Sequence, residues 1–246
     1  MNLPEIDDIK TPWTLNEKSV LSHLHTDPEN GLLSTEASRR LSFVGYNKIE
    51  SGKKISLFRI ILNQFISPFV LLLAIAAGLS FFFEEWLEGF AIIAVIIINA
   101  VIGFFMEFQA ERSMEALKKL TMVPARVLRD GKLTQIPSEE VVPGDMLFVE
   151  GGDMITADAR LIKLTQLQTD ESALTGESLP VEKAISPLTN ETPLAERNNM
   201  LYKGTFVVKG NGYALVVHTG MSTELGSVAR MVQQAQQAAT PLEKKI

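Results

Sequence analysis

The sequence has 246 residues and a formal net charge of −6, so it allows one large domain or two small ones and does not suggest a nucleic-acid partner. It contains no cysteine, which excludes disulfides, thiolate catalysis and cysteine-ligated metal. Its mean hydropathy of +0.14 is high for a chain with 21% charged residues, so the apolar residues must be concentrated in particular segments.

Residues 1–55 are predicted to form a segment of short amphipathic helices. Thr14 followed by Glu17 resembles a capping box at the start of one helix. Ser34 is predicted to cap a second helix, which Gly45 would end. Helices of this length are not stable alone in water, so we expect the segment to pack on the domain that follows the membrane region.

Two apolar stretches follow, and both lack charged residues over nearly the length that a bilayer core requires. They predict a helical hairpin over residues 56–106, with spans at about 60–83 and 87–106. The alternative, two buried core helices of a soluble domain, is disfavoured because both stretches are apolar on all faces. Basic residues flank the hairpin and only the acidic "EEWLE" joins its spans, so both termini are expected in the cytoplasm, with the spans in the plasma (inner) membrane.

After the spans, residues 107–121 are predicted to continue the second helix into water as a stalk. Residues 122–220 then read as a β-rich domain, because short alternating strands are separated by glycine turns. We expect one hairpin at Asp130-Gly131 and another at 210–212, which suggests a small β-barrel or sandwich.

Two further strands are expected within "DMLFVEGGDMITADARLIKL", with turns at Gly151-Gly152 and near Asp158. Residues 221–246 are predicted to form a helical linker, in which Ser222 caps a helix that runs to Thr240.

The string "TGES", formed by Thr175, Gly176, Glu177 and Ser178, is the most informative local motif. Alone it would be a polar loop in which glycine adopts a positive φ. It is not alone, however: "VVPGDMLFVEGGDMITADARLI" precedes it, "DESALTGESLPVEK" surrounds it, and "TGMSTELGSVA" follows.

Taken in this order, the motifs resemble the N-terminal part of a P-type cation-transporting ATPase of the calcium-pump-like type. "GLLSTEASRRLSFVGYNKI" is similar to the family's N-terminal segment, "NQFISPFVLLLAIAAGLSFF" to its first membrane helix, and "ATPLEKKI" to the lead-in to its third. The resemblance implies a mixed α and β membrane protein: a two-helix transmembrane hairpin, short N-terminal helices and a cytoplasmic, jelly-roll-like actuator domain.

The resemblance also implies roles for the "TGES" residues. Glu177 would be the carboxylate that orients or deprotonates the water that hydrolyses an aspartyl-phosphate held elsewhere. Gly176 would let the backbone approach the phosphoryl group, and Thr175 and Ser178 would shape the loop. We expect Asp170 and Glu171 to hold the loop through hydrogen bonds. No cofactor or metal ligand is assigned in this chain, whereas Mg²⁺ and ATP are expected for the complete pump.

The sequence departs from the family pattern in one decisive way, because the phosphorylated Asp-Lys-Thr-Gly-Thr motif is absent from it. By itself the chain is therefore expected neither to bind nor to hydrolyse ATP. The sequence does not decide whether it forms part of an active enzyme. Its expected partners are the lipid bilayer and the remainder of the pump, in cis or in trans. Two alternatives remain: a truncated, non-catalytic partner or regulator of a pump chain, and a membrane-anchored β-domain binding module. The transported ion is not determined, with calcium as the default expectation.

Overall fold

The computed structural model describes residues 9–49, 68–120 and 123–238, without the side chains of 111–120 and 236–238. The chain divides into two compact units. One comprises Met1–Ser51 together with Val123–Ile246, and the other comprises Gly52–Met122.

The N-terminal segment contains the 3₁₀ helix η1 (Pro12–Thr14) and the helices α1 (Glu17–His23) and α2 (Ser34–Val44). Asn16, not Thr14, caps α1, because its side-chain oxygen accepts the Ser19 amide at 2.8 Å. Thr14 lies inside η1, where its hydroxyl donates to a carbonyl instead. The capping-box prediction is therefore wrong, because the residue directly before the helix reaches the free amide of the first turn.

The start of α2 also differs from the prediction. Ser34 is its first helical residue, and its amide and hydroxyl both donate to the Asp130 carboxylate. A carboxylate 96 positions away thus occupies the place of a local cap, where it also faces the positive end of the helix dipole. Gly45 ends α2 with φ of 83°, as predicted.

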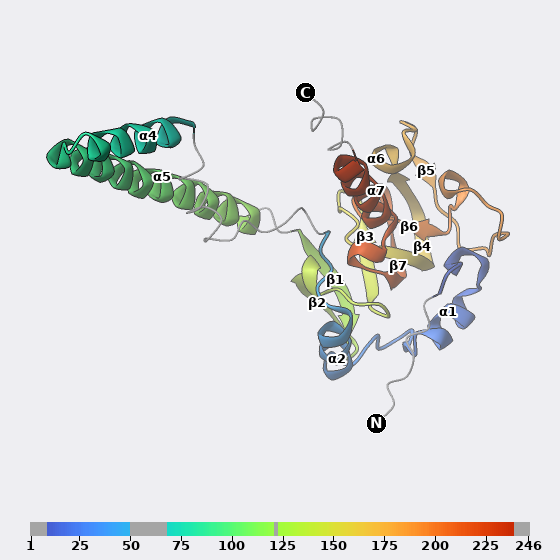
Figure 1. The fold of residues 1–246 in the computed structure, drawn as a ribbon. Helices are drawn as coiled ribbons and strands as arrows, with labels where there is room; N and C mark the ends of the chain where they lie inside the picture. The colour runs from blue at the N-terminus through green and yellow to red at the C-terminus, as the bar shows by residue number, and fades with distance from the viewer. Residues whose placement is uncertain (1–8, 50–67, 121–122, 239–246) are drawn as a thin grey trace. The chain divides into compact units, whose positions relative to one another are not determined.

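Seven antiparallel strands form one sheet, visible on the right of Figure 1. They are β1 (Pro124–Arg129), β2 (Lys132–Pro137), β3 (Met146–Glu150), β4 (Asp158–Asp170), β5 (Val181–Glu182), β6 (Met200–Leu201) and β7 (Phe206–His218). Their order is β2-β1-β3-β7-β4-β5, with β6 paired to β4. In the described part of the chain this path has two ends, so the strand pairing does not close into a barrel, one of the two predicted forms.

The first predicted hairpin is confirmed. Arg129 pairs with Lys132, and Asp130 and Gly131 between them have φ of 51° and 70°. Positive φ at both central residues is the signature of a two-residue turn whose twist matches that of the strands.

The second predicted hairpin is wrong, because β7 runs straight through residues 210–212. Gly210 lies against a bulge of β4, where an added Cβ would come within 2.2 Å of the Gln166 carbonyl oxygen. The glycine therefore serves a close approach of two backbones rather than a turn. The chain bends at Ala157, next to the turn expected near Asp158, and β4 then runs for 13 residues from Asp158.

The main core lies within the sheet and is formed by buried aliphatic side chains of β1, β3, β4 and β7, including Val127, Leu147, Leu161, Ala214 and Val216. A second cluster joins the N-terminal segment to the sheet, because Trp13 and Leu24 share it with Met146 and Leu215. The short N-terminal helices are thus stabilised by tertiary packing.

The helix α7 (Glu224–Ala238) follows a 3₁₀ turn, η4 (Gly220–Ser222). The predicted cap at Ser222 is wrong: the Thr223 hydroxyl accepts the Gly226 amide at 3.0 Å, as an N-cap does. The predicted end at Thr240 lies outside the described residues.

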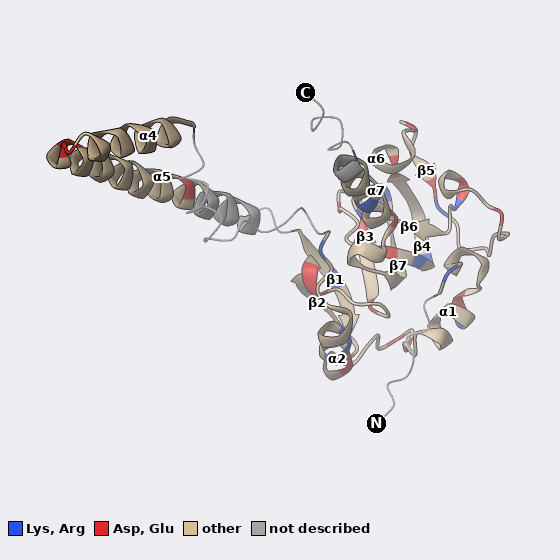
Figure 2. Cartoon of the chain, in the orientation of Figure 1, with Lys and Arg blue, Asp and Glu red and all other residues tan. Residues whose placement is uncertain are grey.

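The second unit contains α4 (Pro68–Phe82) and α5 (Trp86–Leu120). Within the described residues, 25 residues of α5 (Trp86–Ala110) are long and apolar enough to cross a membrane, with a mean hydropathy of 2.6. Figure 2 shows few charges along these helices and acidic residues near their shared turn. The predicted hairpin is not established, because residues 60–67 of its first span lie outside the described residues.

Candidate functional site

The "TGES" residues lie in the loop that leaves β4 and returns through β5. The loop begins with a single helical turn, α6 (Ser172–Thr175). Its base is narrow, because β4 and β5 pair through only two residue pairs, Gln168 with Glu182 and Thr169 with Val181. The loop is therefore a projecting element with a short backbone anchor.

Gly176 ends α6 in the left-handed conformation, with φ of 78° and ψ of −1°. Residues with a Cβ rarely adopt this conformation. An added Cβ would have no atom of this unit within 4 Å. Glycine is therefore required here by the positive φ of the backbone and not by close packing within this unit. The positive φ expected for a polar loop is thus confirmed, and the space above Gly176 is open.

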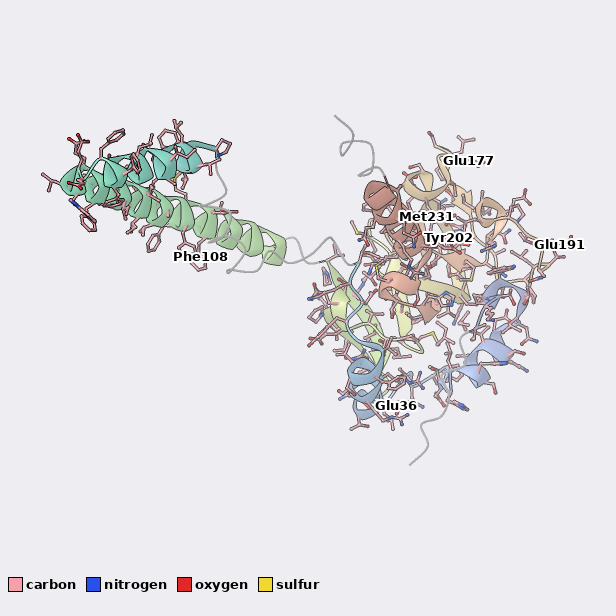
Figure 3. All side chains as sticks on the ribbon, viewed as in Figure 1. Glu36, Phe108, Glu177, Glu191, Tyr202 and Met231 are labelled. Carbon is pink, nitrogen blue, oxygen red and sulfur yellow. The ribbon has the colours of Figure 1, made fainter. Side chains whose placement is uncertain are left out.

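Glu177 stands at the exposed tip, as Figure 3 shows at the edge of the domain. Its amide donates to the Thr175 hydroxyl at 3.3 Å, and that hydroxyl donates to the Glu171 carbonyl at 3.1 Å. Among the described residues, no hydrogen bond to the Glu177 carboxylate is found. Ser178 is exposed beside it. The structure therefore fixes the backbone at Glu177 while leaving its carboxylate available to another molecule or domain.

Asp170 and Glu171 hold the start of the loop, as the sequence predicts. Asp170 accepts the Ser172 amide at 2.9 Å, and the hydroxyl and amide of Ser172 lower the pKa of this carboxyl below its usual value. Glu171 is buried, accepts the Thr169 hydroxyl at 2.9 Å and forms an ion pair with Lys183. Burial lowers the pKa of Lys183, and the Glu171 charge opposes that effect.

A second buried acid anchors the beginning of α7. Asp158 is 1% exposed and accepts the amides of Lys203 at 2.8 Å and Glu224 at 2.7 Å. Burial raises the pKa of Asp158 to about 7, although the two amide hydrogen bonds act in the opposite direction. The carboxyl group therefore joins the start of β4 to the first turn of α7.

Asn47 joins three other parts of the same unit. Its side-chain amide donates to the carbonyls of Ser138 and Thr156, at 2.9 and 2.8 Å. Its side-chain oxygen accepts the Gly220 amide at 2.8 Å and the Lys203 ammonium at 2.6 Å. Every hydrogen-bonding position of this buried side chain is filled, so it fixes the N-terminal segment and the approach to α7 on the sheet.

Comparison with known proteins now identifies these regions. Residues 119–233 match the family model of the P-type ATPase actuator domain, and residues 12–80 match the model of the cation transporter/ATPase N-terminus. The chain carries the N-terminal and actuator regions of the P-type cation-transporting ATPases. The family resemblance drawn from the sequence is thereby confirmed.

The curated relatives are much longer than this chain. It is 42% identical to the cation-transporting ATPase pma1 of Synechocystis, over 93% of this chain and 25% of that protein. It is 39% identical to a calcium-transporting ATPase of Bacillus subtilis, over 94% of the chain and 26% of that protein. It is 37% identical to a sodium/potassium exporting P-type ATPase of Schizosaccharomyces pombe, over 88% and 21%. The chain thus spans about a quarter of the length of these relatives.

Within the compact unit that contains the actuator region, sequence reasoning missed three residues: Asp158, Lys183 and Asn47. The only signal for Asp158 is an acid within the apolar stretch "ITADARLI". Nothing in the sequence around Lys183 predicts its role except that it follows the loop, and nothing in the sequence around Asn47 predicts its role. The described residues contain no group of three His, Asp or Glu that could hold a metal ion.

A cavity of about 240 Å³ lies along β1 and β3, and its lining includes none of the "TGES" residues. Arg126 in its wall is already paired with Glu150 at 2.6 Å and with Asp153.

Proposed function

We propose that this chain is the N-terminal and actuator part of an ATP-driven cation pump, and that Glu177 promotes hydrolysis of an aspartyl-phosphate carried elsewhere in the pump. The observation that carries the proposal is the position of Glu177 on an exposed, backbone-anchored tip within a domain of the actuator family. A carboxylate that acts in another domain's site must be both accessible and held in a defined position.

The chemistry requires one water molecule and one base. The water oxygen attacks phosphorus in line with the bond to the aspartyl oxygen, which breaks as the new P–O bond forms. Glu177 orients the water and accepts its proton, and the products are inorganic phosphate and a free aspartate carboxylate. The left-handed conformation of Gly176 turns the chain without placing a Cβ beside the tip, which supports a close approach to the phosphoryl group.

The same domain would couple this reaction to ion gating. In this proposal, the actuator rotates to bring Glu177 to the phosphate, and residues 107–121 and 221–246 transmit the rotation to the membrane helices. The contacts of Asp158 with the first turn of α7 support such a role, because they attach one of these linkers firmly to the sheet.

The membrane arrangement and the ligands belong to the same proposal. The chain would cross the plasma (inner) membrane twice, at about 60–83 and 87–106, with both termini in the cytoplasm. The single long apolar helix within the described residues supports the second span. The complete pump would use ATP and Mg²⁺. Calcium is the first cation to test, because several relatives are named calcium-transporting, and sodium and potassium follow.

The decisive experiment replaces Glu177 with glutamine in the complete pump. The amide keeps the shape of the side chain but cannot accept the water proton, so phosphoenzyme should form normally and break down about 10²- to 10⁴-fold more slowly. Glu191→Gln is the matched control, since Glu191 is also an exposed loop glutamate of this unit (Figure 3). Breakdown of the Glu177→Gln phosphoenzyme at the rate of the control would refute the proposal.

The relation of the chain to its partner is tested by the mass of the native polypeptide. A species several-fold heavier than 27.2 kDa in the source membrane places the phosphorylated aspartate in cis. A species at 27.2 kDa requires a partner chain that carries it.

A further inference from the structure

The buried ion pair between Glu171 and Lys183 is an unusual way to close a loop. The side chains of Lys183 and Glu171 are 0% and 1% exposed, so both charges have lost their hydration. Within the described residues, the second oxygen of Glu171 has no hydrogen-bond partner. A buried pair of this kind adds little net stability compared with an apolar pair of the same volume, whereas loss of one partner is strongly destabilising. Stability alone therefore does not explain the pair.

The pair is connected to the tip of the loop by a short chain of contacts. Lys183 binds the Glu171 carboxylate, and the Glu171 carbonyl accepts both the amide of Thr175, at 2.9 Å, and its hydroxyl, at 3.1 Å. The Thr175 hydroxyl in turn accepts the Glu177 amide at 3.3 Å. Movement of Glu171 would therefore be transmitted to the backbone of Glu177 through one residue.

Little else in this unit holds the tip. Residues 176–180 are all exposed, and Leu179 is 80% exposed. The strand pair at the base contains only two residue pairs. The anchor of the loop therefore consists of this short ladder, the hydrogen bond from the Lys183 amide to the Leu167 carbonyl, the packing of Leu174 on the second core cluster, the Asp170 hydrogen bond and the buried ion pair.

We infer that Glu171 and Lys183 are positioning residues for phosphoenzyme hydrolysis, which hold the loop so that Glu177 presents its carboxylate in one orientation. The inference rests on the proposed function of Glu177. Neither residue touches the phosphate, because both are enclosed in the domain. Their effect passes through Thr175, and a loop without the pair would keep Glu177 but present it in many orientations, only a few of which are productive.

The first test uses the double variant Glu171→Gln/Lys183→Met in the complete pump. It removes both charges while nearly conserving volume, so no unpaired buried charge is left. We expect phosphoenzyme to form at the normal rate and to break down about tenfold more slowly, with an unfolding temperature close to that of the unmodified protein. A pair with a purely structural role would instead lower the unfolding temperature and leave the breakdown rate of folded molecules unchanged.

The second test reports on the loop directly and does not depend on the pump reaction. A glutamate-specific protease is applied to this chain, and cleavage after Glu177 is compared with cleavage after Glu191 in the same digest. The double variant should raise this ratio several-fold, because an exposed loop that loses its anchor becomes a better substrate. Cleavage after Glu191 corrects for any general loosening of the domain.

The combined outcomes separate the inference from the proposed function. If Glu177→Gln slows breakdown and the double variant changes neither breakdown nor the cleavage ratio, the inference is overturned. A change in only one of these two quantities also overturns it, because the effect on hydrolysis would then not arise from order in the loop. If Glu177→Gln itself has no effect, the proposed function fails, and the cleavage ratio still decides whether the pair orders the loop.

A milder variant covers the case in which the double variant does not fold. Thr169→Val removes only the hydroxyl that donates to Glu171 and keeps the shape of the side chain. We expect breakdown about threefold slower and a raised cleavage ratio. Thr26→Val is the matched control, since Thr26 is a buried threonine whose hydroxyl donates to the Gly144 carbonyl at 2.8 Å. Equal behaviour of the two variants would overturn the inference.

Discussion

Replacement of Gly210 by alanine tests the close approach of the β7 and β4 backbones. Gly210 has φ of 78°, and its added Cβ would stand 2.2 Å from the Gln166 carbonyl oxygen and 2.4 Å from that of Thr165. Real Cβ atoms essentially never approach another heavy atom closer than 3.0 Å, so the two backbones must separate by about 0.8 Å. Neither neighbour is a flexible side-chain end, so the sheet itself has to give way.

The expected loss of stability has two parts. A left-handed conformation costs a residue with a Cβ about 1–2 kcal/mol. Separation of β7 from the β4 bulge weakens about two of the hydrogen bonds that pair these strands around Thr165 and Gln168, at about 1 kcal/mol each. The total is about 3–4 kcal/mol. Gly152→Ala is the matched control: Gly152 has φ of 95° but no atom within 4 Å of an added Cβ, so only about 1–2 kcal/mol is expected.

The assay is urea unfolding of the chain in detergent, followed by the fluorescence of one tryptophan. The sequence has two tryptophans, and Trp86→Phe leaves Trp13, which is buried in the cluster that contains Leu215 of β7. Trp13 therefore reports on the unit that contains Gly210. If Gly210→Ala lost no more stability than Gly152→Ala, the close approach of β7 to β4 would be refuted.

Two further predictions use the same assay. Asp130→Gly keeps a residue that accepts the φ of 51° but removes the carboxylate that caps α2, so it should lower the free energy of unfolding by about 1 kcal/mol. Asp130→Asn should lose less, since asparagine also accepts this φ and one acceptor oxygen remains; equal losses would contradict the capping role. The folded domain holds a proton on Asp158 up to a pKa of about 7, whereas the unfolded chain releases it near 3.8. The free energy of unfolding should therefore fall as the pH rises from about 3.8 to about 7, by at most about 1.4 kcal/mol per pH unit, and level off above pH 7. The control Asp158→Asn should lack this slope, and an unchanged slope would show that another group titrates.

Two features that depend only on neighbours in the sequence were predicted correctly, whereas the caps predicted at Thr14 and Ser222 are instead at Asn16 and Thr223. The turn at Asp130-Gly131 needs only two residues that accept positive φ, and the helix stop at Gly45 needs only one. The family was recognised because the motifs around Glu177 stand in a fixed order, which is a property of the sequence itself. The role of Glu177 was assigned in the same way and stays a proposal.

Features that depend on distant partners were decided only by the tertiary structure. Gly210 has the same local signal whether it forms a turn or faces a bulge, and the β4 backbone beside it makes the difference. Asp130 caps a helix 96 positions earlier, and Lys183 meets Glu171 only when β5 pairs with β4. The sequence by itself thus determined the turn at Asp130-Gly131, the end of α2 at Gly45, the apolar helix and the family. Which charges are buried and which backbones touch depends on contacts between residues far apart in the chain, and those exist only once the sheet has formed.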